Sequence, residues 1–177
     1  MPRWWGPAYS GSLILSTNAR PVPAVSLDRR ATDAFETPWL SWIGPWDLSV
    51  FLGQLESDRH VPDALLFGMR FTLRPLQGLE IGLSRAAQWG GEGRPDGFDT
   101  FLNMLRGKDN RGHDLDVDDE PGNQLAGVDL RWSSPVGDAP YALYLQVIGE
   151  DEADHLPSAN FALYGAEMWG ALADGSW

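Results

Sequence analysis

The sequence predicts an all-β protein in which about seven or eight strands form an antiparallel meander, with one short helix inside a loop. Three observations lead to this fold class. Apolar and polar side chains alternate with a period of two, the connections alternate between long and short, and acidic residues gather in the long connections. In a meander every second connection lies at the same end of the sheet. This layout is typical of an outer-membrane β-barrel, and a soluble antiparallel sandwich or barrel is the alternative.

The first strands along the chain have the weakest patterns. Residues 12–16 and 22–27 are short apolar segments, and Pro21 and Pro23 interrupt the second, which suits an edge strand or an irregular entry into the sheet. Residues 47–53 alternate more regularly, because leucine and valine at every second position are separated by polar or small residues. The sequence therefore predicts a regular strand in this third segment.

The clearest strand runs from Ala64 to Leu73. Its apolar side chains fall on one face, and they are Leu65, Phe67, Met69, Phe71 and Leu73. Residues 79–83, 126–132 and 141–147 continue the alternation, and residues 161–169 form a strand whose apolar face the pattern does not define. A barrel would expose the stripe from Leu65 to Leu73 to lipid, whereas a sandwich would bury it. We expect a continuous apolar outer face with no sheet or helix packed over it.

The connections determine where the charge lies. The long ones are Glu56–Asp63, Gly90–Gly122 and Glu150–Ser158, and the short ones are Arg74–Gly78 and Ser134–Pro140. Within the longest, apolar residues at helical spacing predict a helix over Phe98–Arg106 that ends before Gly107. The long connections contain most of the 25 acidic residues but few of the 13 basic ones, so the end that they share carries nearly all of the net charge of −12.

Composition excludes several classes of function. The chain has 177 residues, 43% of them hydrophobic, which suits a single domain over residues 1–177. The net charge of −12 argues against a nucleic-acid partner. Because there is no cysteine, the chain has no thiolate nucleophile and no cysteine-ligated metal. No apolar stretch approaches the length of about 18 residues that a membrane helix needs, and the first residues lack the apolar stretch of a signal peptide.

The nine tryptophans include two that suggest membrane interfaces. Trp89 ends its strand at the long-loop end and Trp132 ends another at the short-turn end, as two aromatic girdles would require. Arg85 conflicts with this pattern, because it has the same parity as the apolar positions 79, 81 and 83. We expect either a bulge that reverses the parity or a position for Arg85 near the interface.

The candidate ligand-binding residues lie in or beside the longest connection. Trp89 could stack on a sugar ring, and Arg94 could donate to a uronic carboxylate from the Gly-rich segment 88–95. Arg106 and Arg111 would add guanidinium groups. A tight surface loop without a ligand is the alternative.

An acidic segment of the same connection is a candidate cation site. Asp114, Asp116 and Asp118 have the spacing that opens an EF-hand calcium loop. That loop also requires a glycine where Asp119 stands and a glutamate where Leu125 stands. The segment is therefore either a weak divalent-cation site, for calcium above all, or a solvated acidic loop.

Other polar clusters do not indicate catalysis. The adjacent Glu150, Asp151 and Glu152 resemble the paired carboxylates of a glycoside hydrolase, but no partner across a cleft is recognisable. The three histidines lie in the three long connections and are read as exposed, with shared metal ligation as the alternative. We therefore expect a protein that is not an enzyme.

Five segments in order resemble the Wzi family of capsule-assembly proteins of the Gram-negative outer membrane. They are Trp4–Pro21, Ile43–Arg59, Gly82–Pro95, Asp119–Trp132 and Leu143–Glu152. The resemblance implies a large outer-membrane β-barrel at the cell surface that binds capsular polysaccharide in a lectin-like manner and helps assemble or anchor the capsule. Family members are several hundred residues long, so this chain would be an internal piece of the barrel. So few strands cannot close a wide barrel, and we expect an open, curved sheet with unpaired edges.

Three functional hypotheses follow. The first is a non-enzymatic barrel whose partners are capsular polysaccharide and outer-membrane lipid, and nothing in the sequence indicates its oligomeric state. Because an acidic surface repels an acidic polymer, we expect divalent cations to bridge the two, with help from Arg94, Arg106 and Arg111. The carboxylates that would hold these cations are Asp114, Asp116, Asp118 and the Glu150–Asp154 cluster. A soluble carbohydrate-binding β-sandwich is the second hypothesis, and a glycan-processing enzyme is the third.

Overall fold

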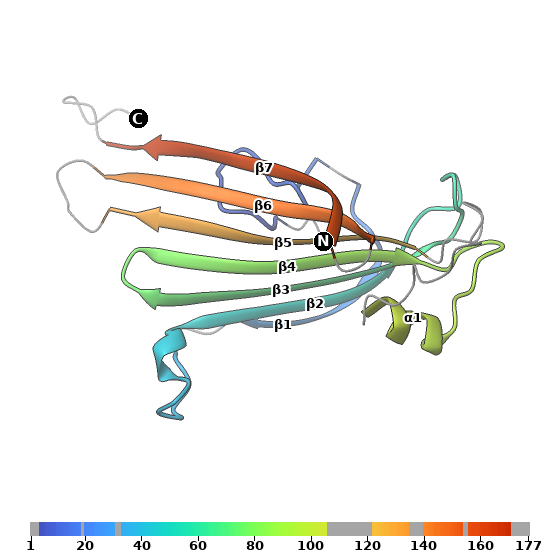
Figure 1. Cartoon of the computed structure of the whole chain (residues 1–177), viewed down its shortest axis with the longest axis horizontal. Helices are drawn as coiled ribbons and strands as arrows, with labels where there is room; N and C mark the ends of the chain where they lie inside the picture. The colour runs from blue at the N-terminus through green and yellow to red at the C-terminus, as the bar shows by residue number, and fades with distance from the viewer. Residues whose placement is uncertain are drawn as a thin grey trace.

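The computed structural model describes residues 4–18, 20–30, 33–105, 122–134, 140–153 and 156–170, and these residues form one antiparallel sheet (Figure 1). Its seven strands are hydrogen-bonded in chain order, from β1 to β7. The elements are β1 (Ala24–Arg30), the 3-10 helix η1 (Ser41–Ile43), β2 (Trp46–Gln54), β3 (Leu65–Leu76), β4 (Leu79–Trp89), α1 (Phe98–Leu105), β5 (Gly122–Ser133), β6 (Tyr141–Ala153) and β7 (Leu156–Met168). Among the described residues, the strands β1 and β7 are the two edges of an open sheet. The predicted meander is confirmed.

Short and long connections lie at opposite ends of the sheet, as the alternation of their lengths predicts. The β3–β4 turn at Gln77 and Gly78 lies beside the end of β5, because Ser133 donates from its backbone N–H to the carbonyl of Gly78 at 2.8 Å. At the opposite end, the β2–β3 connection meets the segment after β4, where the Glu92 N–H donates to the Pro62 carbonyl at 2.9 Å. Helix α1 lies at this long-loop end (Figure 1). Residues 106–121 and 135–139, which the prediction also included, lie outside the described residues.

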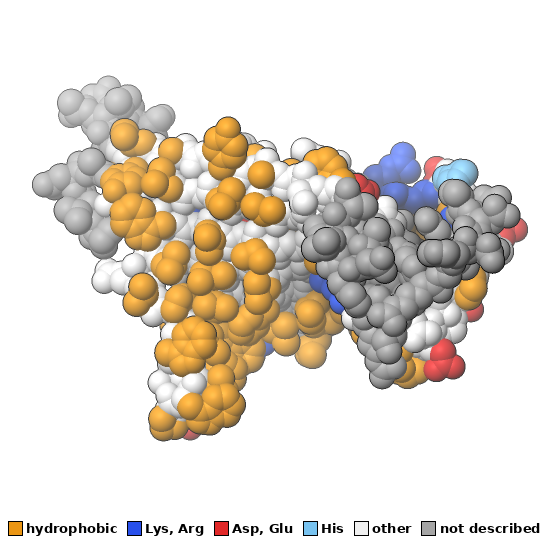
Figure 2. Space-filling view, in the orientation of Figure 1, with side chains coloured by type: hydrophobic (Ala, Val, Ile, Leu, Met, Phe, Trp, Pro, Cys, Tyr) orange, Lys and Arg blue, Asp and Glu red, His pale blue; other side chains and the backbone are white. Residues whose placement is uncertain are grey.

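The two faces of the sheet differ in chemistry. We call the face against which residues 4–18 pack the inner face, and the opposite one the outer face. The continuous register from β1 to β7 places most of the exposed large apolar residues of the strands on the outer face, and they include Val25, Leu27, Leu52, Met69, Leu83, Val128, Leu130, Trp132, Leu143, Leu145, Val147, Tyr164 and Met168. Phe161, which pairs with Ile148, is exposed on the inner face. Figure 2 shows the apolar side chains of the outer face spread over the strands. The predicted apolar outer face is therefore present.

Helix α1 corrects the expectation that nothing packs over this face. Its Phe101 ring lies with its centroid 5.5 Å from that of Phe67 and 4.9 Å from that of Trp89. Met104, on the same side of the helix, is 1% exposed in a cluster with Phe67 and Trp89. The helix is amphipathic, so it buries this stripe against the outer face of β3 and β4 at the long-loop end. The chain pattern could not show this contact, because the stripe of β3 is apolar whether lipid or a helix covers it.

Arg85 lies on the outer face because the β3–β4 register shows no bulge from Leu65 to Leu73. Its guanidinium donates to the carbonyls of Leu105 and Met104 at 2.8 and 2.7 Å, and also to the side chain of Gln124. A cation beside the last carbonyls of a helix satisfies acceptors that lack partners and interacts favourably with the helix dipole. Helix α1 therefore supplies the polar partners that allow the charged Arg85 guanidinium to lie on an otherwise apolar face.

Two predicted elements are wrong. Residues 12–16 form no strand; Leu15 makes an isolated bridge with Trp5, and residues 4–18 lie against the inner face. The segment Glu150–Ser158 is no long loop, since β6 continues to Ala153 and pairs there with Leu156 at the start of β7. Acidic residues and proline are poor strand formers, and hairpin pairing overrides that local preference.

The described residues contain no helix long and apolar enough to cross a membrane.

Candidate functional site

The inner face is held together by ion pairs that reach across an intervening strand. Arg70 of β3 makes two hydrogen bonds to Asp129 of β5, at 2.6 and 2.9 Å, and a third to the Ser84 hydroxyl of β4 at 2.7 Å. Arg70 is 8% exposed and Asp129 only 2%. Gly82 makes room for this pair, since a Cβ there would lie 2.4 Å from the Arg70 guanidinium. The Arg70–Asp129 pair therefore covers the inner face of β4 at Gly82, and its polar atoms are bonded to each other.

The N-terminal segment packs over another part of the inner face. The Gln146 side chain accepts from the Leu13 N–H at 2.9 Å and donates to the Trp5 carbonyl at 3.0 Å. Arg131 donates to the Pro7 carbonyl and to Glu167, each at 2.7 Å. The Glu167 carboxylate also accepts from the backbone N–H of Tyr9. Residues 4–18 are thus bound to β5, β6 and β7 through side chains that alternate with the outer apolar ones.

A tryptophan anchors the same segment on the other half of the sheet. The Trp5 ring packs against Phe51 at a centroid distance of 5.4 Å, in a cluster with Leu55, Ala64 and Leu66. Gly68 permits the approach, because a Cβ there would lie 2.2 Å from the Phe51 ring. A cavity of about 330 Å³ remains beside Trp5, lined in part by edge strand β1, to which we assign no ligand. The inner face of the central strands thus has its own internal partners.

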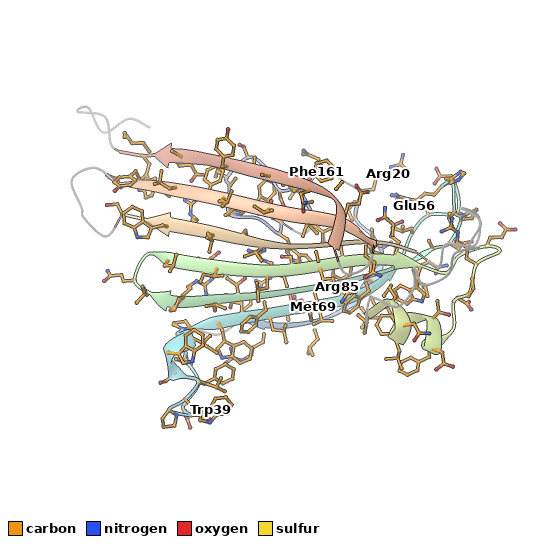
Figure 3. The ribbon with its side chains drawn as sticks, in the orientation of Figure 1. Arg20, Trp39, Glu56, Met69, Arg85 and Phe161 are labelled. Atoms are coloured by element: carbon orange, nitrogen blue, oxygen red, sulfur yellow. The ribbon has the colours of Figure 1, made fainter. Side chains whose placement is uncertain are left out.

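The long-loop end presents charged groups to solvent. Arg59 forms a 2.6 Å ion pair with Glu56 in the β2–β3 connection. The Arg59 hydrogen bond holds the pKa of Glu56 below its usual value, and the positive charge of Arg20 contributes more weakly in the same direction. Figure 3 shows Arg20 and Glu56 at this end, far from Trp39 at the other. The sequence reasoning did not include Arg20 and Arg59 in the candidate site. A signal for Arg20 was available, because an antiparallel pair places the start of β1 beside the end of β2, and residue 20 lies just before β1.

The predicted site residues separate in the structure. Arg94 is half-buried in the segment after β4, and its backbone N–H donates to the Gly91 carbonyl. Trp89 is 5% exposed beneath Phe101, so we leave it out of the binding surface that we propose below. Arg106, Arg111, Asp114, Asp116 and Asp118 lie outside the described residues. Within the part of the chain that the structure describes, no group of three or more acidic or histidine residues is placed to hold a metal ion.

An antiparallel meander with an apolar outer face, a bonded polar inner face, and long and short connections at opposite ends is the wall of a transmembrane β-barrel. The family model of the capsule assembly protein Wzi matches residues 1–176, and the chain belongs to this family. The prediction of an all-β meander forming part of an outer-membrane β-barrel is thereby confirmed.

Two relatives support the assignment. The chain is 46% identical over 168 residues to an uncharacterized 55.8 kDa protein of the cps region of Klebsiella pneumoniae. The matched region is 94% of this chain and 32% of that protein. It also matches a solved structure with a TM-score of 0.76 and 42% identity, over 93% of this chain and 34% of the other. That structure is Wzi of Escherichia coli, described as an outer-membrane protein involved in group 1 capsule assembly and a carbohydrate-binding β-barrel. The chain spans about a third of the length of both relatives.

Proposed function

We propose that this chain is part of the wall of an outer-membrane barrel that binds capsular polysaccharide at the cell surface, helps assemble or anchor the capsule, and is not an enzyme. The observation that carries the proposal is the fold match, over 93% of the chain, to an E. coli barrel described as carbohydrate-binding. The distribution of surface chemistry supports it, because the outer face suits lipid and many polar side chains of the described inner face are bonded to one another or to residues 4–18. These two faces leave the long-loop end as the surface for a polymer outside the cell.

Arginines at the long-loop end are the groups suited to an acidic polysaccharide. A guanidinium donates two parallel hydrogen bonds to a carboxylate, which gives both attraction and orientation. Arg20, Arg59 and Arg94 lie at this end in the described part of the chain. Arg106 and Arg111 belong to the same connection as Arg94, and we include them in the proposed surface.

Divalent cations complete the proposal, because the long connections are strongly acidic. Repulsion between loop carboxylates and a polyuronate acts within about 8 Å at physiological salt. Calcium held weakly by Asp114, Asp116 and Asp118 would replace this repulsion with shared coordination, since carboxylate oxygens are its preferred ligands. The chain has no other proposed cofactor.

Retention of an acidic capsular polysaccharide by the full-length protein tests the surface. We expect the combined Arg94→Gln, Arg106→Gln and Arg111→Gln variant to bind at least about tenfold more weakly, because a charge-assisted contact contributes about 1.5–3 kcal/mol and about 1.4 kcal/mol corresponds to a factor of ten. Arg30→Gln is the matched control, since Arg30 ends β1 at the short-turn end. Equal binding by the triple variant and the control would reject the arginine surface.

Calcium dependence is measured in the same assay. Chelator should weaken retention, and the combined Asp114→Asn, Asp116→Asn and Asp118→Asn variant should lose that response. Retention that chelator leaves unchanged would reject bridging while leaving the arginine contacts intact. Incubation should also leave the chain length of the polymer unchanged, and shortening of the polymer would contradict the proposal that the protein is not an enzyme.

A further inference from the structure

The connection between β1 and β2 exposes two large aromatic side chains at the short-turn end. We call residues 33–45 the aromatic connection. Within it Trp39 is 73% exposed and Trp42 is 66% exposed. Figure 2 shows this region as an apolar projection continuous with the outer face, and Figure 3 labels Trp39 at its tip. Tryptophan buries a large apolar area wherever it finds a partner, so this exposure calls for one.

Ring contacts attach the aromatic connection to the outer face. Phe35 stacks on Trp46 with centroids 4.6 Å apart and an interplanar angle of 17°. The Arg29 guanidinium lies 3.4 Å from the centroid of the Trp46 ring and donates to the Trp46 carbonyl at 2.8 Å. Trp46 also contacts Phe71, and the register places Arg29, Trp46 and Phe71 on the outer face. The connection therefore folds outward and does not cover the inner face.

The shape of the aromatic connection is built by its own hydrogen bonds. The backbone N–H groups of Leu40 and Ser41 both donate to the Thr37 carbonyl, at 2.9 and 3.0 Å, and Ile43 donates to Leu40 at 3.1 Å. Gly44 then turns the chain back to β2 with a φ of 70°, where a Cβ would lie 1.9 Å from the Arg74 carbonyl oxygen. A folded segment between these two points presents Trp39 and Trp42 in a defined place.

We propose that the aromatic connection is a membrane-interface anchor whose two tryptophans insert among the headgroups of inner-leaflet phospholipids. This inference rests on the proposed outer-membrane function. Short turns of such barrels face the periplasm, and tryptophan concentrates at the membrane–water interface. Irregular backbone is not tolerated in the hydrocarbon core, which places the connection at headgroup level. Trp132 and Met168 are exposed on the outer face at the same end and continue the surface around the sheet.

Phospholipid fits this surface better than other occupants do. Further strands of a closed barrel would pair with the free backbone edge of β1, in the surface of the sheet, whereas the aromatic connection projects outward from it. The only charged residues among 33–45 are Asp33 and Glu36. An acidic segment without lysine or arginine suits zwitterionic headgroups and disfavours a strongly anionic surface.

Depth-resolved fluorescence quenching tests the anchor in the full-length protein. The sequence of this chain contains no cysteine. Single cysteines introduced into a cysteine-free background can therefore carry the fluorophore NBD. Trp39→Cys and Trp42→Cys probe the anchor one at a time, which leaves the other tryptophan in place. Leu145→Cys on the outer face of β6 is the lipid reference, and Asp58→Cys in the β2–β3 connection is the aqueous reference. Each folded variant is placed in phosphatidylcholine vesicles that carry nitroxides at the headgroup or deep in the acyl chain.

Labels at positions 39 and 42 should be quenched at least about twofold more by the headgroup nitroxide than by the deep one. The label at position 145 should be quenched by the deep nitroxide, and the label at position 58 by neither. Labels at 39 and 42 that behave like position 58, while position 145 is quenched, would overturn the anchor alone. Shielding of 39 and 42 from both nitroxides and aqueous iodide would also overturn it, in favour of a protein partner. An unquenched label at 145 would overturn the barrel wall itself.

Discussion

On the inner face, Asp129 and Gln146 are almost fully buried and hydrogen-bonded, whereas on the outer face their chain neighbours Val128 and Leu145 are 46% and 39% exposed. One step along each strand therefore separates a side chain that needs a specific partner from one that needs only an apolar surrounding. The inner face therefore confers specificity through paired polar groups. The outer face is mostly apolar, and its fit to lipid depends on cover for its arginines, since Arg85 bonds to carbonyls of α1 and Arg29 lies over the Trp46 ring.

Breaking the buried ion pair should have the largest effect. Asp129→Asn leaves the Arg70 guanidinium buried without its counter-charge, which should lower the free energy of unfolding of the full-length barrel by about 3–5 kcal/mol. Replacement of both partners, as Arg70→Met with Asp129→Leu, should restore much of the loss because no charge is left unpaired. Denaturant titration in detergent micelles measures both. A loss under about 1 kcal/mol for Asp129→Asn would show that the pair is solvated.

A charge on the outer face should have the next largest effect. Leu145→Arg should cost about 2–4 kcal/mol if the residue lies near the middle of the bilayer. Leu76→Arg makes the same chemical change beside the β3–β4 turn, where Leu76 is 68% exposed, and should cost about 0–1 kcal/mol at the interface. Unfolding of both variants in lipid vesicles gives the difference. Equal costs for the two would show that the outer face does not contact a hydrocarbon layer.

Detaching the N-terminal segment from the inner face should have a smaller effect. Gln146→Leu removes the partner of the Leu13 N–H, while the Trp5 carbonyl keeps the Ser12 hydroxyl as a donor. One unsatisfied group of this kind costs about 1–3 kcal/mol. The change should also expose residues 4–18 to protease in the folded protein. Gln88→Leu is the control, because Gln88 is exposed on the inner face of β4. Protease resistance that matches the control would mean that Gln146 does not hold the segment.

The smallest effect concerns the helix on the outer face. Arg85→Met removes the donors to the Met104 and Leu105 carbonyls, and the helix-terminal charge contributes up to about 2 kcal/mol. Amide hydrogen exchange in α1 should become faster, while exchange in β6 stays unchanged. Arg94→Met, in the same connection but before the helix, provides the comparison. Unchanged protection of α1 would indicate that the Phe101 and Met104 contacts hold the helix by themselves.

The sequence predicts the strands and their faces better than it predicts what covers them. Alternation is a local property, so Leu65 and Phe67 could be placed on the outer face from the pattern of one segment. Their burial beneath α1 joins residues that are more than 30 positions apart in the chain, and periodicity carries no information on such contacts. The same reason explains why the parity of Arg85 conflicted with the apolar face until the helix carbonyls supplied its partners.

The sequence indicates less about the surroundings of the candidate site residues than about the fold. Trp89 has the residue type and position of a sugar platform, but its burial depends on the packing of Phe101. The β6–β7 hairpin extends through an acidic segment that local preferences assign to a loop. Arg20 and Arg59 reach the long-loop end because of the strand register, which the one-dimensional pattern leaves open. Positions on a face follow from the sequence, and neighbours across the sheet require the structure.

Accessibility of spin labels along β6 tests most directly that this sheet is a barrel wall with lipid outside and protein inside. Single nitroxide labels at positions 143 to 148 of the full-length protein in phospholipid vesicles would be compared for collision with oxygen and with a water-soluble nickel chelate. We predict a period of two, in which Leu143, Leu145 and Val147 collide with oxygen. Tyr144, Gln146 and Ile148 should be shielded from oxygen by the protein. High nickel accessibility at positions 143, 145 and 147, or the reverse alternation, would contradict the account.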